Sequence, residues 1–200
     1  ERCGDGSAGG FRVSSGDGQF QMCRAFYNSG YGFYSTYGNA VFTDCTATSN
    51  TSNGFSIYES NGSLNRCKSE KNGDKGFTCA GGGTYTLSEC IAVNNSTTGI
   101  FTDDKAVLTS CVASKNNYGI AVQGNAIIKD CLATENKGNG INVYSNDDYG
   151  LASIVSGRIA NKNGGDGISI KSDDFQVLNN TVRNNGGYGI TTSGSGGRIE

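Results

Sequence analysis

The stretch "CVASKNNYGIAVQGNAIIKDCLATENKGNGI", from Cys111 to Ile141, contains nearly the same phrase twice. In each copy a cysteine is followed two residues later by alanine, five residues later by asparagine, and then by Gly-Ile. The second cysteine, Cys131, lies 20 residues after Cys111. Internal repeats with periods of about 20 to 50 residues are typical of solenoids, propellers and related arrays. The phrase therefore predicts further copies along the chain.

Further copies occur through the chain as aligned positions, here called columns. One column is an anchor glycine followed by an apolar residue, at Gly10, Gly32, Gly54, Gly76, Gly99, Gly119, Gly140, Gly167 and Gly189. A second column holds Cys23, Cys45, Cys67, Cys90, Cys111, Cys131, Arg158 and Asn180. Five residues after each of these stands an asparagine, at Asn28, Asn50, Asn72, Asn95, Asn116, Asn136, Asn163 and Asn185. The period is about 22 residues.

The pattern inside each repeat is that of short strands. Apolar residues alternate locally, as in Gly-Ile-Ala-Val at 119–122, which is the period of a strand with one buried face. No segment keeps a helical period for ten residues. The repeat therefore predicts three short strands per turn, each stacked in register on the next turn at about 4.8 Å.

On these residues the chain resembles the right-handed parallel β-helix family, which is pectate-lyase-like. The family's loose repeat, N-x-I-x-x-N-x-x-x-G-I-x-V, is matched by "NTVRNNGGYGITT" (Asn180–Thr192) and, with cysteine in the first position, by earlier repeats. The resemblance implies an all-β, single-stranded, right-handed solenoid of about nine coils. We expect one array over residues 1–200, as a segment of a longer chain or assembly. Function does not follow, because the family includes lyases, hydrolases, epimerases, phage tailspikes and adhesins.

The two polar columns have structural interpretations. In-register stacking predicts that the asparagines form a ladder in which each side-chain amide binds its neighbours and the turn backbone. Cysteines stacked at the strand spacing are too far apart for disulfides, whose Cβ atoms lie about 3.8 Å apart, so we expect buried free thiols. Asn61 is the glycosylation sequon expected in an exposed turn.

The amino-acid composition argues against several classes of function. A net charge of -2 gives no basic face, so neither nucleic acid nor an anionic membrane surface is an expected partner. No apolar run approaches the roughly 20 residues of a membrane span, and we expect no membrane insertion. The absence of histidine removes the commonest general base and the usual zinc ligand. Any catalysis would therefore have to use carboxylates, Tyr, Lys or Arg side chains, or a bound hard cation.

Acidic turns are the first candidate site. The interval from Gly140 to Arg158 is longer than the others and presents "VYSNDDYGLAS", and the next coil carries "KSDDF". Three interpretations stay open. The pairs are solvated turns, or they bind calcium through Asp147, Asp148, Asp173 and Asp174, or they act on a glycosidic bond. In the last case the candidate catalytic residues are Asp148, Asp173, Lys171 and Arg158.

Tyrosines are the second candidate site. Tyr31, Tyr34, Tyr37 and Tyr58 fall at outward or turn positions of adjacent coils, and Tyr144 and Tyr149 lie in the long interval. Sugar faces stack on such rings, so these residues form a candidate saccharide platform. The alternative is ordinary half-buried tyrosine on a pleated surface.

The residue after each cysteine position is expected to point outward, which gives an apolar stripe at Ile91, Val112, Leu132 and Ile159. Such a stripe marks an interface. The leading hypothesis is a non-catalytic extracellular or cell-surface rod that presents a long face to polysaccharide or to partner subunits. The alternatives are a polysaccharide lyase or hydrolase working from the acidic turns, and a filament built by end-to-end stacking, that is, a homo-oligomer.

Overall fold

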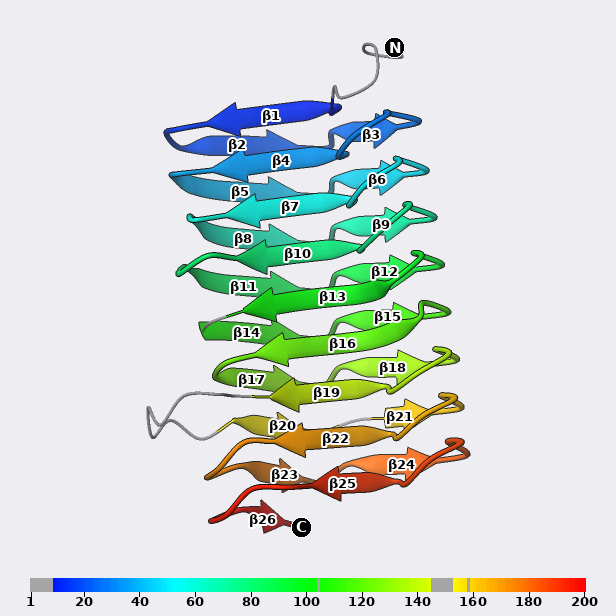
Figure 1. The fold of residues 1–200 in the computed structure, drawn as a ribbon. Coiled ribbons are helices and arrows are strands. Elements are labelled where there is room, and N and C mark those ends of the chain that lie inside the picture. The colour runs from blue at the N-terminus through cyan, green and yellow to red at the C-terminus, as the bar shows by residue number, and fades with distance from the viewer. Residues whose placement is uncertain (1–8, 104, 145–152, 158) are drawn as a thin grey trace.

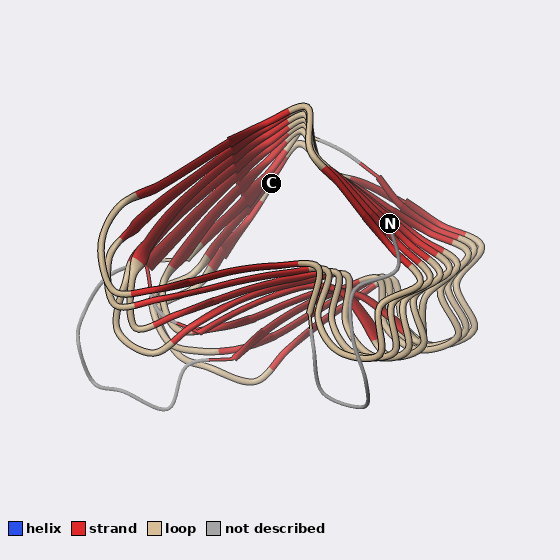
Figure 2. Ribbon diagram, turned by 90° about the horizontal axis from the view of Figure 1, so that it is seen from above, coloured by secondary structure: helices blue, strands red, loops and turns tan. Residues whose placement is uncertain are grey.

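A computed structural model describes residues 9–103, 105–144, 153–157 and 159–200. Over these residues the chain forms 26 short strands and no helix, and the described strands pair in parallel from coil to coil. Figure 1 shows the coils stacked in sequence order from the N-terminus to the C-terminus. Seen along the axis, three sheets enclose a triangular cross-section (Figure 2). The predicted all-β parallel solenoid is confirmed.

Sheet A has nine strands and begins each coil. Its strands are β1 (Phe11–Ser14), β4 (Phe33–Thr36), β7 (Phe55–Tyr58), β10 (Phe77–Ala80), β13 (Thr98–Asp103), β16 (Tyr118–Gln123), β19 (Ile141–Tyr144), β22 (Ile168–Lys171) and β25 (Ile190–Thr192). The register pairs the residues that follow the anchor glycines, as in Phe33 opposite Phe55. The repeat seen in the sequence is therefore the repeat of the coil.

Sheets B and C complete each coil. Sheet B consists of β2 (Gly18–Gln21), β5 (Asn39–Thr43), β8 (Asn61–Asn65), β11 (Thr84–Ser88), β14 (Lys105–Thr109), β17 (Ala126–Lys129), β20 (Ile154–Ser156), β23 (Gln176–Leu178) and β26 (Arg198–Ile199). Sheet C consists of β3 (Arg24–Phe26), β6 (Thr46–Thr48), β9 (Lys68–Glu70), β12 (Ile91–Val93), β15 (Val112–Ser114), β18 (Leu132–Thr134), β21 (Ile159–Asn161) and β24 (Thr181–Arg183). Nine, nine and eight strands agree with the prediction of about nine coils.

The core is a set of stacked columns. Near the N-terminus Phe33, Phe55 and Phe77 stack with ring centres 4.7 and 4.9 Å apart, and Phe42 packs edge-on against the first two. From Ile100 to Ile168 the same column is isoleucine and is buried, and Ile190 in the last coil is partly buried. Burial of these side chains is the main stabilising contribution, at about 1.5–3 kcal/mol for each large apolar group.

The predicted asparagine ladder is present. Asn95 donates from its backbone N–H to Asn116 Oδ1 at 2.9 Å and from Nδ2 to the same oxygen at 3.2 Å. The same pair of bonds joins Asn28 to Asn50 and continues coil by coil to Asn185. The anchor glycines fit against this ladder. A Cβ added at Gly76 would lie 2.8 Å from Asn95 Nδ2 and 2.4 Å from Gly99 O, so the column needs glycine for close approach.

The cysteine column also agrees with expectation. Every cysteine that the structure describes is a free thiol, and all but Cys23 are buried. The Cys90 thiol donates to Leu64 O of the preceding coil at 3.5 Å. Burial raises the pKa of the Cys45 thiol to about 11. These residues act as small buried groups in the core.

Two predictions about the surface have different outcomes. The apolar stripe points outward on sheet C, where Ile91 is exposed and Val112, Leu132 and Ile159 are half-buried. Asn61 is exposed as predicted, but the expected turn is wrong, because Asn61 begins β8 and its Nδ2 donates to Asn39 Oδ1 at 3.0 Å. No helix among the described residues has the length and apolarity to cross a bilayer.

Candidate functional site: the outer face of sheet A

The outer face of sheet A brings a cation and aromatic rings together at its N-terminal end. Phe33 points into the core, so Tyr34, the next residue on β4, points outward. Register pairing places Arg12 of β1 directly opposite Tyr34. The guanidinium carbon of Arg12 lies 5.4 Å from the centre of the Tyr34 ring, within the range of a cation–π contact. Arg12 Nε also donates to Ser14 Oγ at 2.8 Å, which orients the guanidinium group.

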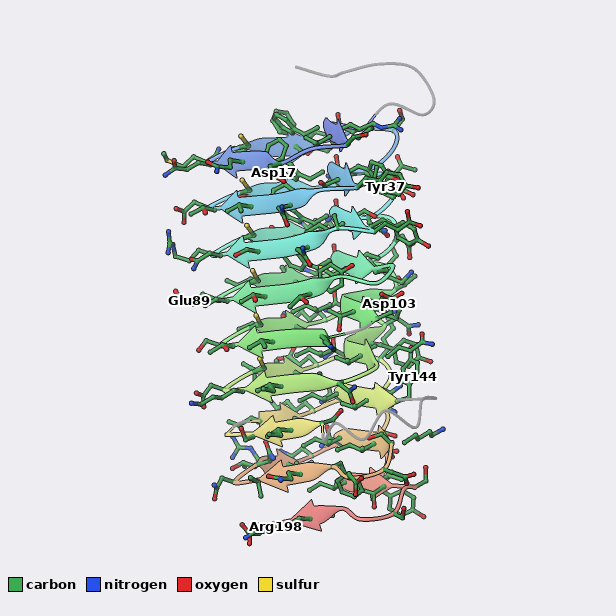
Figure 3. The ribbon with its side chains drawn as sticks, turned by 90° about the vertical axis from the view of Figure 1, so that its left-hand side faces the viewer. Asp17, Tyr37, Glu89, Asp103, Tyr144 and Arg198 are labelled. Atoms are coloured by element: carbon green, nitrogen blue, oxygen red, sulfur yellow. The ribbon has the colours of Figure 1, made fainter. Side chains whose placement is uncertain are left out.

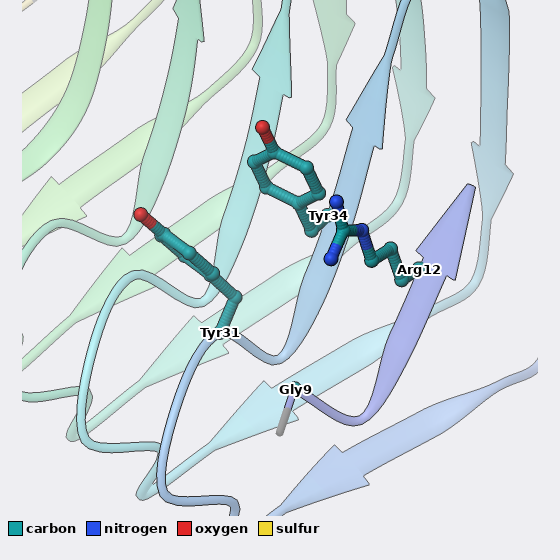
Figure 4. Close-up of a pocket in the computed structure, with 4 residues that line it drawn as sticks. All are labelled: Gly9, Arg12, Tyr31 and Tyr34. Atoms are coloured by element: carbon teal, nitrogen blue, oxygen red, sulfur yellow. The ribbon is translucent and has the colours of Figure 1, made fainter. Parts of the chain in front are cut away.

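Tyr31 completes this cluster from the turn before β4. Its ring centre is 5.1 Å from that of Tyr34, and the two planes are tilted by 30°. Together with Gly9, the three side chains line a pocket of about 240 Å³ (Figure 4). The pocket joins an exposed guanidinium group, which favours carboxylate or sulfate, to two rings that can stack on the face of a sugar. We call Arg12, Tyr31 and Tyr34 the first cluster.

Two further tyrosines of the proposed platform, Tyr37 and Tyr58, lie farther along the strands. Tyr58 ends β7 on the outer face of sheet A and is 44% exposed. Tyr37 lies at the corner between sheets A and B, beyond the end of β4 (Figure 3). A hydrogen bond from the Tyr37 hydroxyl to the Glu59 carboxylate raises the pKa of Tyr37. Tyr31 and Tyr34 are therefore in ring contact, whereas Tyr37 pairs with a carboxylate.

Tyr144 and Lys171 occupy the same edge of sheet A, farther down the solenoid. Register pairing gives the order Asp103, Gln123, Tyr144, Lys171. Burial, and then the nearby Asp103 carboxylate, raise the pKa of Tyr144. Asp103 Oδ1 accepts a hydrogen bond from the Gly81 N–H at 2.8 Å. This edge therefore carries a carboxylate, Asp103, and an ammonium group, Lys171, whereas the charged group of the first cluster is the Arg12 guanidinium.

The acidic turn at Asp173 and Asp174 joins β22 to β23. Asp173 Oδ1 accepts hydrogen bonds from the backbone N–H and the hydroxyl of Ser195, and these bonds lower the pKa of Asp173. Asp174 has a φ of 49°, in the left-handed region that Asp adopts more readily than most residues. The pair therefore shapes the turn between successive coils.

The calcium and catalytic hypotheses also depend on Asp147, Asp148, Tyr149 and Arg158, which lie outside the described residues. Within the described part of the chain, no group of three or more His, Cys, Asp or Glu side chains converges as a metal site would require. Both hypotheses stay predictions.

Arg12 is the site residue that sequence reasoning missed. The available signal was its position two residues after an anchor glycine, where side chains point outward from sheet A. That column reads Arg12, Tyr34, Ser56, Thr78, Phe101, Ala121, Asn142, Ser169 and Thr191. Its variety contrasts with the uniform inward columns.

Comparisons with known proteins agree on the architecture. The family model described as "Right handed beta helix region" matches residues 9–154. Among solved structures, the chain is similar to a double mutant of the periplasmic alginate epimerase AlgG, with a TM-score of 0.61 at 11% sequence identity. The similarity covers 92% of this chain and 60% of that one. No curated protein sequence matches the chain significantly.

Proposed function

The chain belongs to the right-handed β-helix family, and from this premise we propose that it is a non-catalytic rod that binds acidic polysaccharide on the outer face of sheet A. The first cluster carries the proposal. Arg12 offers a charged donor to a carboxylate or sulfate, while Tyr31 and Tyr34 offer ring faces to the sugar. Guanidinium-to-carboxylate hydrogen bonds contribute about 1.5–3 kcal/mol each.

The similarity to the alginate epimerase supports the choice of ligand and place. That protein's activity concerns an acidic polysaccharide, and it is periplasmic. We therefore propose an extracytoplasmic location for this rod and choose alginate as the first polysaccharide to test. Because the shared identity is low, the argument for binding rests on the first cluster of this chain.

A polysaccharide lyase or hydrolase working from Asp148 and Asp173 is the second candidate. Asp173 is engaged by Ser195, and its lowered pKa keeps its carboxyl group ionised at neutral pH. An ionised carboxylate can act as a base or nucleophile but cannot donate the proton that a leaving glycosidic oxygen needs. This candidate therefore also needs a proton donor, and Asp148 lies outside the described residues. The filament alternative stays a prediction.

The test is binding of alginate and of a neutral glucan by isothermal calorimetry. We expect alginate to bind and Arg12→Gln to weaken it about tenfold or more, as does Tyr34→Ala. Tyr188→Ala is the control, because Tyr188 is exposed but lies at the opposite end of the rod. Equal affinity of Arg12→Gln and the parent protein would reject the proposal. Release of unsaturated or reducing ends would favour the enzyme instead.

A further inference from the structure

A second cation–aromatic pair lies farther along the same face. Lys75, in the turn before β10, places its Nζ 5.7 Å from the centre of the Phe101 ring on β13. Phe101 is half-buried and belongs to the outward column that contains Arg12 and Tyr34. Lys75 Nζ also lies 3.6 Å from Asp74 Oδ2, and both side chains remain partly exposed. We call Lys75 and Phe101 the second cluster.

The coil register fixes the separation of the two clusters. Tyr34 pairs with Ser56 and Thr78 pairs with Phe101, while β7 pairs with β10 between them. Three coil steps separate the two rings, or about 14 Å at the spacing of neighbouring strands. The intervening column positions carry the short side chains of Ser56 and Thr78, and Ser56 is only 6% exposed. An extended ligand would therefore contact the Tyr34 and Phe101 rings, which are separated only by short side chains.

The flanking residues indicate the direction in which such a ligand runs. Two residues beyond Phe101 along β13, toward the corner with sheet B, stands the Asp103 carboxylate. An anionic chain that crossed the sheet there would approach a like charge. A chain that runs parallel to the solenoid axis along the column of Tyr34 and Phe101 stays two residues to the side of Asp103, whose own column contains Tyr58.

We propose that the second cluster is a second anionic-sugar subsite and that one glycan chain lies along the solenoid axis across both clusters. This inference rests on the proposed function. It adds the second subsite, the direction of the chain and a minimum length of ligand. Joining two weak subsites through one ligand raises affinity because the second contact is intramolecular, and gains of about 100-fold or more are typical when the linker spans the gap.

The experiment is a calorimetric length series. Size-fractionated oligoalginates of increasing length are titrated into the full chain. We expect nearly constant affinity for oligomers that fill only the first cluster, a step of at least about tenfold once the oligomer spans about 14 Å, and then a plateau. Lys75→Gln should remove the step and leave the affinity for short oligomers unchanged. Lys129→Gln, at an exposed lysine at the end of β17 in sheet B, is the matched control.

The outcomes separate the two proposals. If short oligomers bind through Arg12 but affinity rises smoothly with length and Lys75→Gln has no effect, the second subsite is rejected and the first stands. If short oligomers do not bind and Arg12→Gln changes nothing, the proposed function fails. Phe101→Ala repeats the test through the ring, with a thermal melt to show that the variant folds. Sulfated oligosaccharides of equal length distinguish a carboxylate subsite from a sulfate subsite, and the step should appear with one of them.

Discussion

The interior of the solenoid and the outer face of sheet A are built from alternate residues of the same strands, yet they follow different rules. Inside, Phe33, Phe55 and Phe77 repeat one residue because each coil must fill the same cross-section. Outside, the neighbouring column changes from Arg12 to Tyr34 to Ser56. Solvent does not impose a match between coils, so differences there are free to serve binding. The uniform columns therefore stabilise the coil, and the varied column is where we propose that recognition occurs.

The largest expected effect concerns thiol protection in the interior. A Cys3→Ser/Cys23→Ser variant keeps six cysteines, all described as buried free thiols. We expect their reaction with an aromatic disulfide reagent at pH 8 to be slowed by about a thousandfold or more relative to the unfolded chain, because access requires opening of the core. All six should react in denaturant. Rapid reaction of several thiols in the native protein would show that the interior is not a closed core.

The next effect concerns the buried ladder. Asn116→Ala removes the acceptor of the Asn95 N–H and the donor to Ala92 O. Buried groups left without partners should lower the free energy of unfolding by roughly 3 kcal/mol. Denaturant titration measures this change, and binding to alginate at temperatures where the variant is folded should be unaltered. A change below about 1 kcal/mol would contradict the structural role of the uniform column.

A matched variant makes the same substitution in an asparagine ladder on the outer surface of the solenoid. Asn61 belongs to an exposed ladder in which Asn61 binds Asn39 and Asn39 binds Asp17. The bonds resemble those of Asn116, but water can replace them. Asn61→Ala should therefore change the free energy of unfolding by less than about 1 kcal/mol. If Asn61→Ala and Asn116→Ala were equally destabilising, burial would not be the reason for the difference between the ladders.

The smallest effect concerns pH. The pKa of Asp173 is lowered by bonds from Ser195, so its contribution to stability is present above the unfolded-state pKa of about 3.9 and is lost as pH falls through the lower folded value. Asp173→Ala should lower the melting temperature slightly at pH 7, where this contribution is present, and leave it unchanged near pH 2, where the parent protein has lost it. Thermal melts from pH 2 to pH 7 test this, with Asp166→Ala as a second aspartate that accepts coil-to-coil bonds. A large effect at neutral pH would mean that the turn is more than a local contact.

Much of the fold could be predicted because in-register stacking makes each interior residue visible many times in the sequence. The asparagine, cysteine and anchor-glycine columns were found in this way. Two further columns were overlooked: the residue before each cysteine of the cysteine column adopts positive φ, as at Asp44 and Arg66, and so does the residue before each ladder asparagine, as at Lys71. The absence of β-branched residues from both columns was the signal, since these residues avoid positive φ.

The candidate site was harder to predict because the outward column of sheet A does not repeat. Tyr31 and Tyr34 were identified as candidates because rings are conspicuous in a sequence. Arg12 became visible only when the register placed it beside Tyr34, and Lys75 only when the turn placed it over Phe101. Cation–aromatic pairs between coils depend on side-chain direction as well as on spacing, and one sequence supplies only the spacing.

The most direct test of the central claim is a map of backbone amide chemical shifts for the isotopically labelled protein titrated with an oligoalginate long enough to bridge both clusters. We predict that the perturbed amides lie along sheet A, from Arg12 through Tyr34 to Phe101, and that those of sheets B and C change little. Shifts centred instead on sheet B, where Val107 and Ile127 line a pocket of about 230 Å³, would contradict the account. So would a titration with no perturbed amides.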